Sequence, residues 1–240
     1  MNPYYFCERL KTNRLFVRKA SIYISSINIL IVFILSTDYL YVHLFNWWYT
    51  IIVPIIIAYI SSLLVDSDKK KDLFFKTMPI DLSKIWLSKI RIAATYLLHS
   101  FIILLIAFLS FKCIIGDNYP NISCFRGIGG AFILYVCSLW QIPFFLYIAY
   151  KTKLFGVLLV SIFCNTIIGT IIAATNYWFL FPFSYLSKLG FYILHITPSG
   201  LFENSIKSYP IEIMMCIVFS IILFAIITRQ TAKWYINKEA

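Results

Sequence analysis

The stretch from Asp66 to Arg91, DSDKKKDLFFKTMPIDLSKIWLSKIR, is the one long charged segment in an otherwise apolar chain of 240 residues. It holds seven of the 21 basic residues and separates two apolar runs, each long enough to cross a bilayer. Because cytoplasmic loops of membrane proteins are enriched in Lys and Arg, we expect this loop to face the cytoplasm. Its position then sets the sidedness of every span before and after it.

The loop over residues 66–91 is predicted to form two short amphipathic helices joined at an elbow. Pro79 disfavours helix at Met78, while Asp81 can accept hydrogen bonds from the amides that open the next helix. Its apolar side chains suit a soluble partner, and a loop that only lies on lipid headgroups is the alternative. The candidate partner contacts are Leu73, Phe74, Phe75, Met78, Pro79, Ile80, Lys84, Ile85, Trp86 and Lys89.

The composition excludes a soluble globular protein. Hydrophobic residues make up 61% of the chain and charged residues 13%, which leaves too few polar side chains to cover a globule. The net charge of +11 could suggest nucleic acid, but the basic residues gather beside the apolar runs rather than along one polar face. Anionic lipid and the preference of Lys and Arg for the cytoplasmic side explain that distribution without nucleic acid.

The apolar runs predict an all-α polytopic membrane protein with six transmembrane helices in one domain over residues 1–240. The spans are expected at 20–37, 47–65, 92–115, 127–150, 154–175 and 211–228. This assignment places 17 of the 21 basic residues, and both termini, in the cytoplasm. Pro54 predicts a kink in the second span, and Gln141 with Pro143 interrupts the fourth.

Two further segments are predicted to lie in the membrane without crossing it. Residues 1–19 contain an amphipathic interfacial helix from Pro3 to Lys19, with Phe6 and Leu10 on its apolar side and Glu8 and Lys11 on its polar side. Residues 176–210 are apolar but are cut by Pro and Gly into pieces too short to span. We expect this outer segment to be re-entrant, shielded by the neighbouring spans.

The chain offers little catalytic chemistry. It contains no GxxxxGK[ST] loop for phosphate, and the only histidine within a predicted span is His99. No acidic or basic residue lies near the middle of a predicted span, which disfavours ion-coupled transport. We therefore expect neither an enzyme nor a chain with a catalytic residue, metal or cofactor of its own.

The six cysteines form no CxxC pair and have no histidine at metal-ligand spacing. Cys113 and Cys124 flank one predicted external loop. They could form a disulfide, although two free thiols are the favoured interpretation.

Five polar residues are candidates for a substrate path: Asn28, Gln141, Asn165, Thr166 and Glu212. For the first four, hydrogen bonding between helices is the favoured interpretation, because such side chains commonly join helices within lipid. Glu212 lies at the outer end of the last span, where it could meet a cationic substrate or simply face water.

Two short motifs carry a family resemblance. Glu8, Lys11, Thr12 and Arg14 fit the pattern ExxKTxR, and MPIDLSKIWLSKI fits P-[VI]-x-x-x-K-I-W-x-x-K through Pro79, Ile80, Lys84, Ile85, Trp86 and Lys89. With the surface helix, the six spans, the loop at 66–91 and the outer segment at 176–210, the chain resembles an ABC-2-type exporter permease. The motifs resemble those of lantibiotic immunity (self-protection) transporter permeases.

The resemblance implies a permease subunit that works with a separate dimer of ABC ATPase subunits, which would bind ATP and Mg²⁺. It also implies a second permease subunit, identical or different, and a coupling role for the loop at 66–91. The task would be to expel an antimicrobial peptide from the bacterial cell membrane, giving immunity or resistance. An exporter of another peptide antibiotic or of a lipid-linked compound is an alternative, and a non-transporting membrane scaffold or signalling partner is an alternative of another class.

Overall fold

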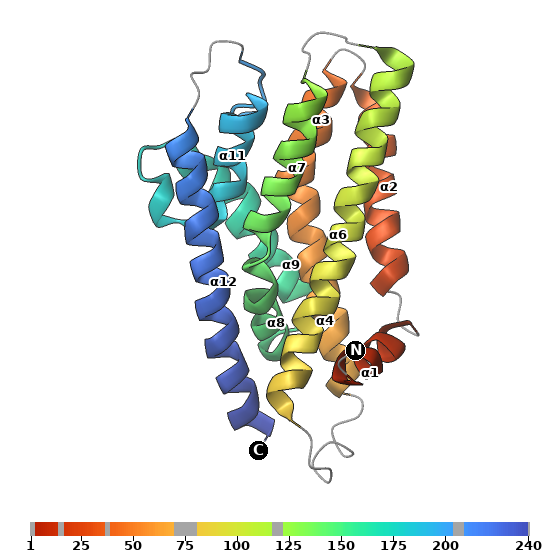
Figure 1. Ribbon diagram of the computed structural model, residues 1–240, viewed down its shortest axis with the longest axis vertical. Helices are drawn as coiled ribbons and strands as arrows, with labels where there is room; N and C mark the ends of the chain where they lie inside the picture. The colour runs from red at the N-terminus through yellow and green to blue at the C-terminus, as the bar shows by residue number, and fades with distance from the viewer. Residues whose placement is uncertain are drawn as a thin grey trace.

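The computed structural model describes residues 3–13, 17–36, 39–69, 81–116, 122–203 and 209–239. These residues form a bundle of helices (Figure 1), and their only β-pairing is an isolated bridge between Ile196 and Phe202. The α-helices are α1 (Pro3–Asn13), α2 (Val17–Leu35), α3 (Leu40–Trp47), α4 (Val53–Lys69), α6 (Leu82–Ile115), α7 (Cys124–Ser138), α8 (Gln141–Lys151), α9 (Leu154–Ile162), α10 (Thr170–Ala173), α11 (Tyr185–Leu194) and α12 (Pro210–Glu239). Two π-helical turns, η1 (Trp48–Ile52) and η2 (Phe163–Gly169), and two 3₁₀ turns, η3 (Trp178–Leu180) and η4 (Pro182–Ser184), complete the bundle.

Four helical segments are long and apolar enough to cross a membrane: Leu40–Ser67, Leu82–Ile114, Leu154–Ala173 and Pro210–Lys238. The bent pair α7 and α8 makes a fifth if it is counted as one span. The apolar part of α2, Lys19–Leu35, is shorter than these. The chain is therefore a helical membrane protein with four or five helices able to span by length and composition, and the count of six stays a prediction.

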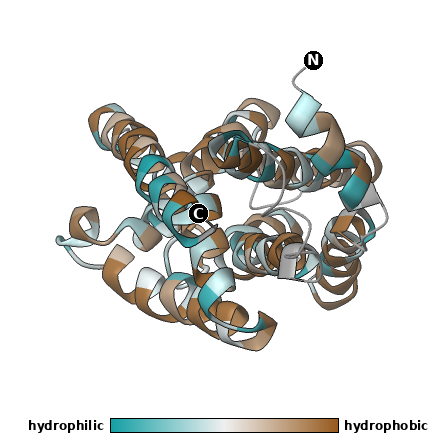
Figure 2. Ribbon diagram, turned by 90° about the horizontal axis from the view of Figure 1, so that it is seen from below, coloured by the Kyte–Doolittle hydropathy of each residue, from teal (hydrophilic) through white to brown (hydrophobic). Residues whose placement is uncertain are grey.

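One end of the bundle is basic. The described ends of the chain, the end of α4 and the start of α6 all lie at this end, as Figure 1 shows. We call it the basic end, after Lys84, Lys89, Lys151 and Lys238. Seen from this end in Figure 2, hydrophobic residues are spread over the sides of the bundle, as lipid contact requires.

Helix α6 corrects the extent of the second of the two short helices predicted in the loop at 66–91, whereas the first helix and the elbow at Pro79 fall on residues 70–80, outside the described residues. The second predicted helix is not separate, because α6 runs without a break for 34 residues from Leu82 to Ile115. Asp81 caps it by accepting a hydrogen bond from the Lys84 amide at 3.3 Å, and the adjacent Lys84 ammonium lowers the pKa of that carboxyl. No Pro or Gly follows until Gly116, so the start of α6 and the following span form one rod about 50 Å long.

Helix α3 corrects a second boundary. The second span was expected to begin at residue 47, yet the helix begins at Leu40 and continues through η1 into α4. Tyr41 and Phe45 are buried and both pack edge-on against Phe108 of α6, with ring centroids 5.7 and 5.2 Å apart. Pro54 is the second residue of α4, just after the π-helical turn η1, and the kink expected there stays a prediction.

The bend between α7 and α8 confirms the predicted interruption of the fourth span. The two helices meet at 43° across Leu139 and Trp140. Pro143 explains the position of the bend, because a proline ring clashes with the carbonyl four residues earlier, which here belongs to Leu139. That carbonyl accepts a hydrogen bond from the Ile142 amide at 3.1 Å, in a tighter turn.

Over its described residues up to Tyr209, the outer segment contains the 3₁₀ turns η3 and η4 and one α-helix, α11, which is too short to span. It packs against α7 and η1 with Leu186, Leu189 and Leu194 buried. Gly190 was expected to cut the segment, but it lies inside α11, and the helix ends at His195 with a left-handed φ of 61°. A Cβ on Gly190 would lie 2.5 Å from the Tyr49 ring, so glycine is needed there for close packing.

The described cysteines show no disulfide. Cys113 and Cys124 are both free and exposed, which agrees with the favoured interpretation of two thiols. Cys137 and Cys216 are buried and act as small apolar side chains in the packing.

Alanine at two glycines should have opposite effects on stability. Gly190→Ala should destabilise the fold by about 1–3 kcal/mol, because the new methyl group collides with the buried Tyr49 ring. Gly129→Ala, in α7 with nothing within 4 Å of a new Cβ, should stabilise it by about 0.5–1 kcal/mol. Thermal unfolding in detergent measures both, and equal shifts in Tm for the two variants would contradict the packing described.

Candidate functional site

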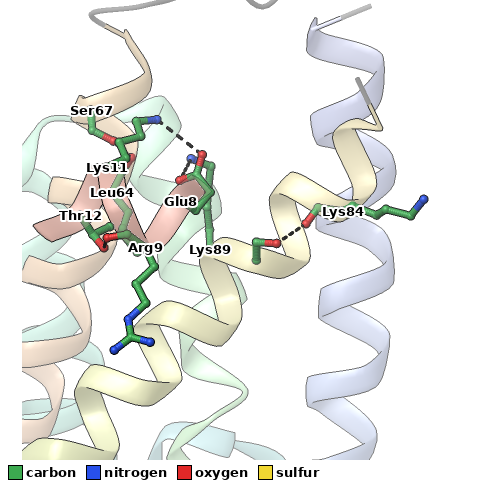
Figure 3. Close-up of polar contacts among 9 residues, drawn as sticks. Glu8, Arg9, Lys11, Thr12, Leu64, Ser67, Lys84 and Lys89 are labelled. Atoms are coloured by element: carbon green, nitrogen blue, oxygen red, sulfur yellow. Dashed lines mark hydrogen bonds and ion pairs between the residues drawn. The ribbon is translucent and has the colours of Figure 1, made fainter. Parts of the chain in front are cut away.

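Helix α1 is attached to α6 by a buried ion pair at the basic end. Lys89 Nζ lies 3.3 Å from Glu8 Oε2, and Lys11 Nζ lies 3.7 Å from Glu8 Oε1 (Figure 3). Lys89 is 0% exposed and Glu8 5%. One turn further along α1, the Thr12 hydroxyl lies 3.3 Å from the Tyr96 hydroxyl of α6, and both residues are buried.

The structure corrects two predictions about the surface helix, namely which side faces the bundle and where the helix ends. Its polar side was expected to face water, but Glu8 and Thr12 face the bundle, while Phe6 and Leu10 are 47% and 51% exposed. The reason is that the buried Lys89 ammonium requires a carboxylate, and Glu8 supplies it. The helix also ends at Asn13 rather than Lys19, and Val17 already belongs to α2.

The two motifs that carry the family resemblance therefore meet in the structure. Glu8 and Thr12 come from the first motif and Lys89 from the second, 81 residues further along the chain. Both motifs were identified from the sequence, but their contact was not predicted. One signal was available: Lys89 lies at helical spacing from Ile85 and Trp86, on the apolar side of its helix, where a charge needs a partner.

The same geometry corrects part of the predicted partner contact. Ile85, Trp86 and Lys89 are 5%, 0% and 0% exposed and face the bundle, so their side chains are not available to a partner subunit. Trp86 Nε1 donates a hydrogen bond to Thr231 of α12 at 3.0 Å, and its ring stacks on Tyr235 at 5.0 Å.

The other residues of the predicted partner contact are either exposed or outside the described residues. Lys84 is exposed and pairs with Asp81 at 2.9 Å. Leu73, Phe74, Phe75, Met78, Pro79 and Ile80 lie outside the described residues. Of the predicted contact residues that the structure describes, Lys84 is thus the one whose side chain faces outward.

A chain of hydrogen bonds joins three helical segments within the bundle. Gln141 Nε2 of α8 donates to Asn165 Oδ1 of η2 at 2.9 Å, and Asn165 Nδ2 donates to the Ser161 carbonyl at 2.9 Å. The Ser161 hydroxyl donates to the Pro54 carbonyl of α4, also at 2.9 Å. Gln141 and Asn165 are buried, so the structure supports the interhelical interpretation of both residues.

Thr166 completes a backbone bond that Pro54 cannot make. The carbonyl of Thr50 would receive the amide of residue 54 in a regular helix, but proline has no N–H. The Thr166 hydroxyl of η2 donates to that carbonyl at 2.6 Å. The two π-helical turns η1 and η2 are thereby joined.

Asn28 and Glu212 lie apart from this network. Asn28 is 2% exposed, and its Nδ2 has no hydrogen-bond partner in the described part of the chain. It lines an apolar hollow of about 300 Å³ between α2 and the helical segment around η1. Glu212 is half-buried at the start of α12. Burial, together with Glu212, raises the pKa of Tyr192 to about 12, so that phenol stays protonated. The structure does not bring the five polar candidates into one site.

Comparison of the chain with models of known families, with curated proteins and with solved structures gives no match. Within the described ranges, no group of three or more His, Cys, Asp or Glu side chains could hold a metal ion. The candidate functional site is therefore the junction of α1 and α6 at the basic end, defined by its own geometry.

Loss of the Glu8 carboxylate should destabilise the protein by about 3 kcal/mol, because Glu8→Gln leaves the Lys89 ammonium buried without its counter-charge. The double variant Glu8→Gln with Lys89→Met should recover part of the loss, since no buried charge is then left behind. Denaturant unfolding in detergent measures both.

The matched control is Lys84→Gln, which breaks the shorter but exposed pair with Asp81. It should leave unfolding unchanged, because exposed pairs contribute little. Equal destabilisation by Glu8→Gln and Lys84→Gln would contradict this account, because the buried pair would then contribute no more to the free energy of unfolding than the exposed pair.

Thr166→Val should cost about 1 kcal/mol of stability, because the Thr50 carbonyl loses its donor. In a Pro54→Ala background the same change should cost much less, since the amide of residue 54 can then bond to Thr50. A double-mutant cycle measured by thermal unfolding gives the coupling, and additive effects would contradict this account.

Proposed function

We propose that this chain is the transmembrane permease subunit of an ATP-driven ABC exporter that expels an antimicrobial peptide of the lantibiotic class from the bacterial cell membrane. One observation supports the proposal above all. The two motifs on which the family resemblance is based contact each other through the buried pair of Glu8 and Lys89. That pair joins the surface helix to the helix that follows the charged loop.

In the proposed exporter, α6 transmits motion from the charged loop to the membrane. A partner that moves the start of α6 also moves α1, because separating the two helices would break the buried pair of Glu8 and Lys89 together with the packing around it. The unbroken length of α6 carries that displacement to the opposite end of the bundle. The chain itself does not hydrolyse ATP in this proposal; a separate dimer of ABC ATPase subunits binds ATP and Mg²⁺.

The proposed topology has six crossings, with α2 and the bent pair α7 and α8 each counted as one. The basic end then faces the cytoplasm together with both termini, because Lys and Arg favour that side. Residues 70–80 and the exposed Lys84 form the docking surface for the ATPase, and a second permease subunit, identical or different, completes the transporter.

The opposite end supplies a surface for an amphipathic peptide. Tyr177, Leu180 and Leu201, in the segment that precedes α12, are 69%, 70% and 69% exposed, and the first turn of α12 carries the half-buried Glu212. Apolar side chains next to an acidic group match a cationic amphipathic peptide, which is the chemistry of the proposed substrate.

Changing two apolar loop residues should separate the permease from its ATPase. The double variant Leu73→Asp with Phe75→Asp should reduce recovery of an ABC ATPase encoded beside this chain by about tenfold or more, because apolar anchors dominate docking surfaces. The same variant should lose protection of a sensitive host against the peptide, measured as the inhibitory concentration, while its amount in the membrane stays unchanged.

The matched control is Tyr177→Asp with Leu201→Asp, which makes two similar changes on exposed residues outside the charged loop. It should retain the ATPase at the wild-type level. Equal recovery of the ATPase with the loop variant and with the control would refute the docking surface. Protection against other peptide antibiotics, but not against lantibiotics, would redirect the proposal to a different substrate.

A further inference from the structure

A groove opens at the basic end between α1, α2 and α6. Its larger hollow has a volume of about 490 Å³ and is lined by Arg9 of α1, Ile22 of α2 and Ile102 of α6, among others. A second hollow of about 430 Å³ is lined by Arg91. Tyr5 and Thr95 line both hollows, so the two adjoin.

The chemistry of this groove changes along its length. Arg91, Thr95 and Ile102 lie on one face of α6, because they are separated by four and seven residues. The groove therefore runs from a charged end to an apolar end, where Ile22 and Ile102 are 39% and 44% exposed. Arg91 and Ile102 are about 16 Å apart along the helix axis, close to the thickness of one hydrocarbon leaflet, about 15 Å.

The two arginines are free to meet an anion. Both are exposed, and neither guanidinium lies in an ion pair with a carboxylate of the described residues, whereas Lys11, Lys84 and Lys89 each do. Figure 3 shows the Arg9 side chain pointing away from Glu8 and Lys89. A guanidinium matches the geometry of phosphate oxygens with two parallel hydrogen bonds.

We propose that this groove is a binding site for one anionic phospholipid of the leaflet at the basic end. Arg9 and Arg91 bind the phosphate, Tyr5 lies beside it, and an acyl chain follows Thr95, Ile22 and Ile102 into the bilayer. The lipid contacts both α1 and α6 and so supports the junction that Glu8 and Lys89 form. This inference needs only a membrane-embedded bundle and does not depend on the transport proposal.

The test compares phosphatidylglycerol with phosphatidylcholine of identical acyl chains, bound to the full purified chain and counted by native mass spectrometry. The wild type should retain phosphatidylglycerol in preference to phosphatidylcholine. Arg9→Gln with Arg91→Gln should weaken phosphatidylglycerol retention about 30-fold, from the usual contribution of each basic residue near anionic lipid.

The matched control is Arg229→Gln with Lys233→Gln, which removes two exposed charges near the basic end of α12, outside the groove. It should retain phosphatidylglycerol as the wild type does. Equal loss in both double variants, or equal retention of the two lipids by the wild type, would overturn the site.

Two further measurements keep the proposal testable if the arginine variant folds poorly. Ile102→Trp fills the apolar end of the groove, leaves both arginines in place and should also lower phosphatidylglycerol retention; unchanged retention would refute the acyl path. Millimolar glycerol 1-phosphate should not displace the lipid. Displacement by it would mean that the groove takes a free phosphate compound instead.

Discussion

The arrangement of the basic end depends on the burial of Lys89. An ammonium inside a helical bundle is stable only beside a counter-charge, and Glu8 of α1 provides it at 3.3 Å. This requirement turns the polar side of α1 toward α6 and leaves Phe6 and Leu10 outside. The same contact places Thr12 against Tyr96 and so fixes the position of α1 along α6.

A related constraint shapes the middle of the bundle, where each backbone polar group must be satisfied without water. Pro54 leaves the Thr50 carbonyl without its usual donor, and Thr166 supplies one from another helix. Pro143 explains the bend at Leu139 and Trp140, where the Leu139 carbonyl accepts a hydrogen bond from the Ile142 amide in a tighter turn. Pro54 and Pro143 thus each interrupt the regular backbone hydrogen bonding of a helix. In both places the carbonyl four residues earlier accepts a hydrogen bond from another donor.

These two constraints bear on the proposed function in different ways. The ion pair makes α1 and α6 one unit at the basic end. Deeper in the bundle, Gln141 joins α8 to η2, Ser161 joins α9 to α4, and Thr166 joins η2 to η1. At the opposite end, Gly190 lets α11 pack directly on Tyr49 of η1. The outer segment therefore packs on η1, the turn whose Thr50 carbonyl accepts the hydrogen bond from the Thr166 hydroxyl.

The sequence by itself determined that this is a helical membrane protein, which stretches of the chain form its long apolar helices, the break near Pro143 and the role of Gln141 and Asn165 as links between helices. Composition, proline chemistry and the cost of unpaired polar groups in lipid are local rules, so they can be applied without a structure. Only the tertiary structure decided that α6 is unbroken, that residues 40–46 are helical, and that Ile85, Trp86 and Lys89 face inward. The reason is that lipid and protein interior are both apolar, so hydrophobic periodicity does not tell which side of a helix meets its neighbours. That choice depends on partners such as Glu8 and Thr231, which lie far away along the chain.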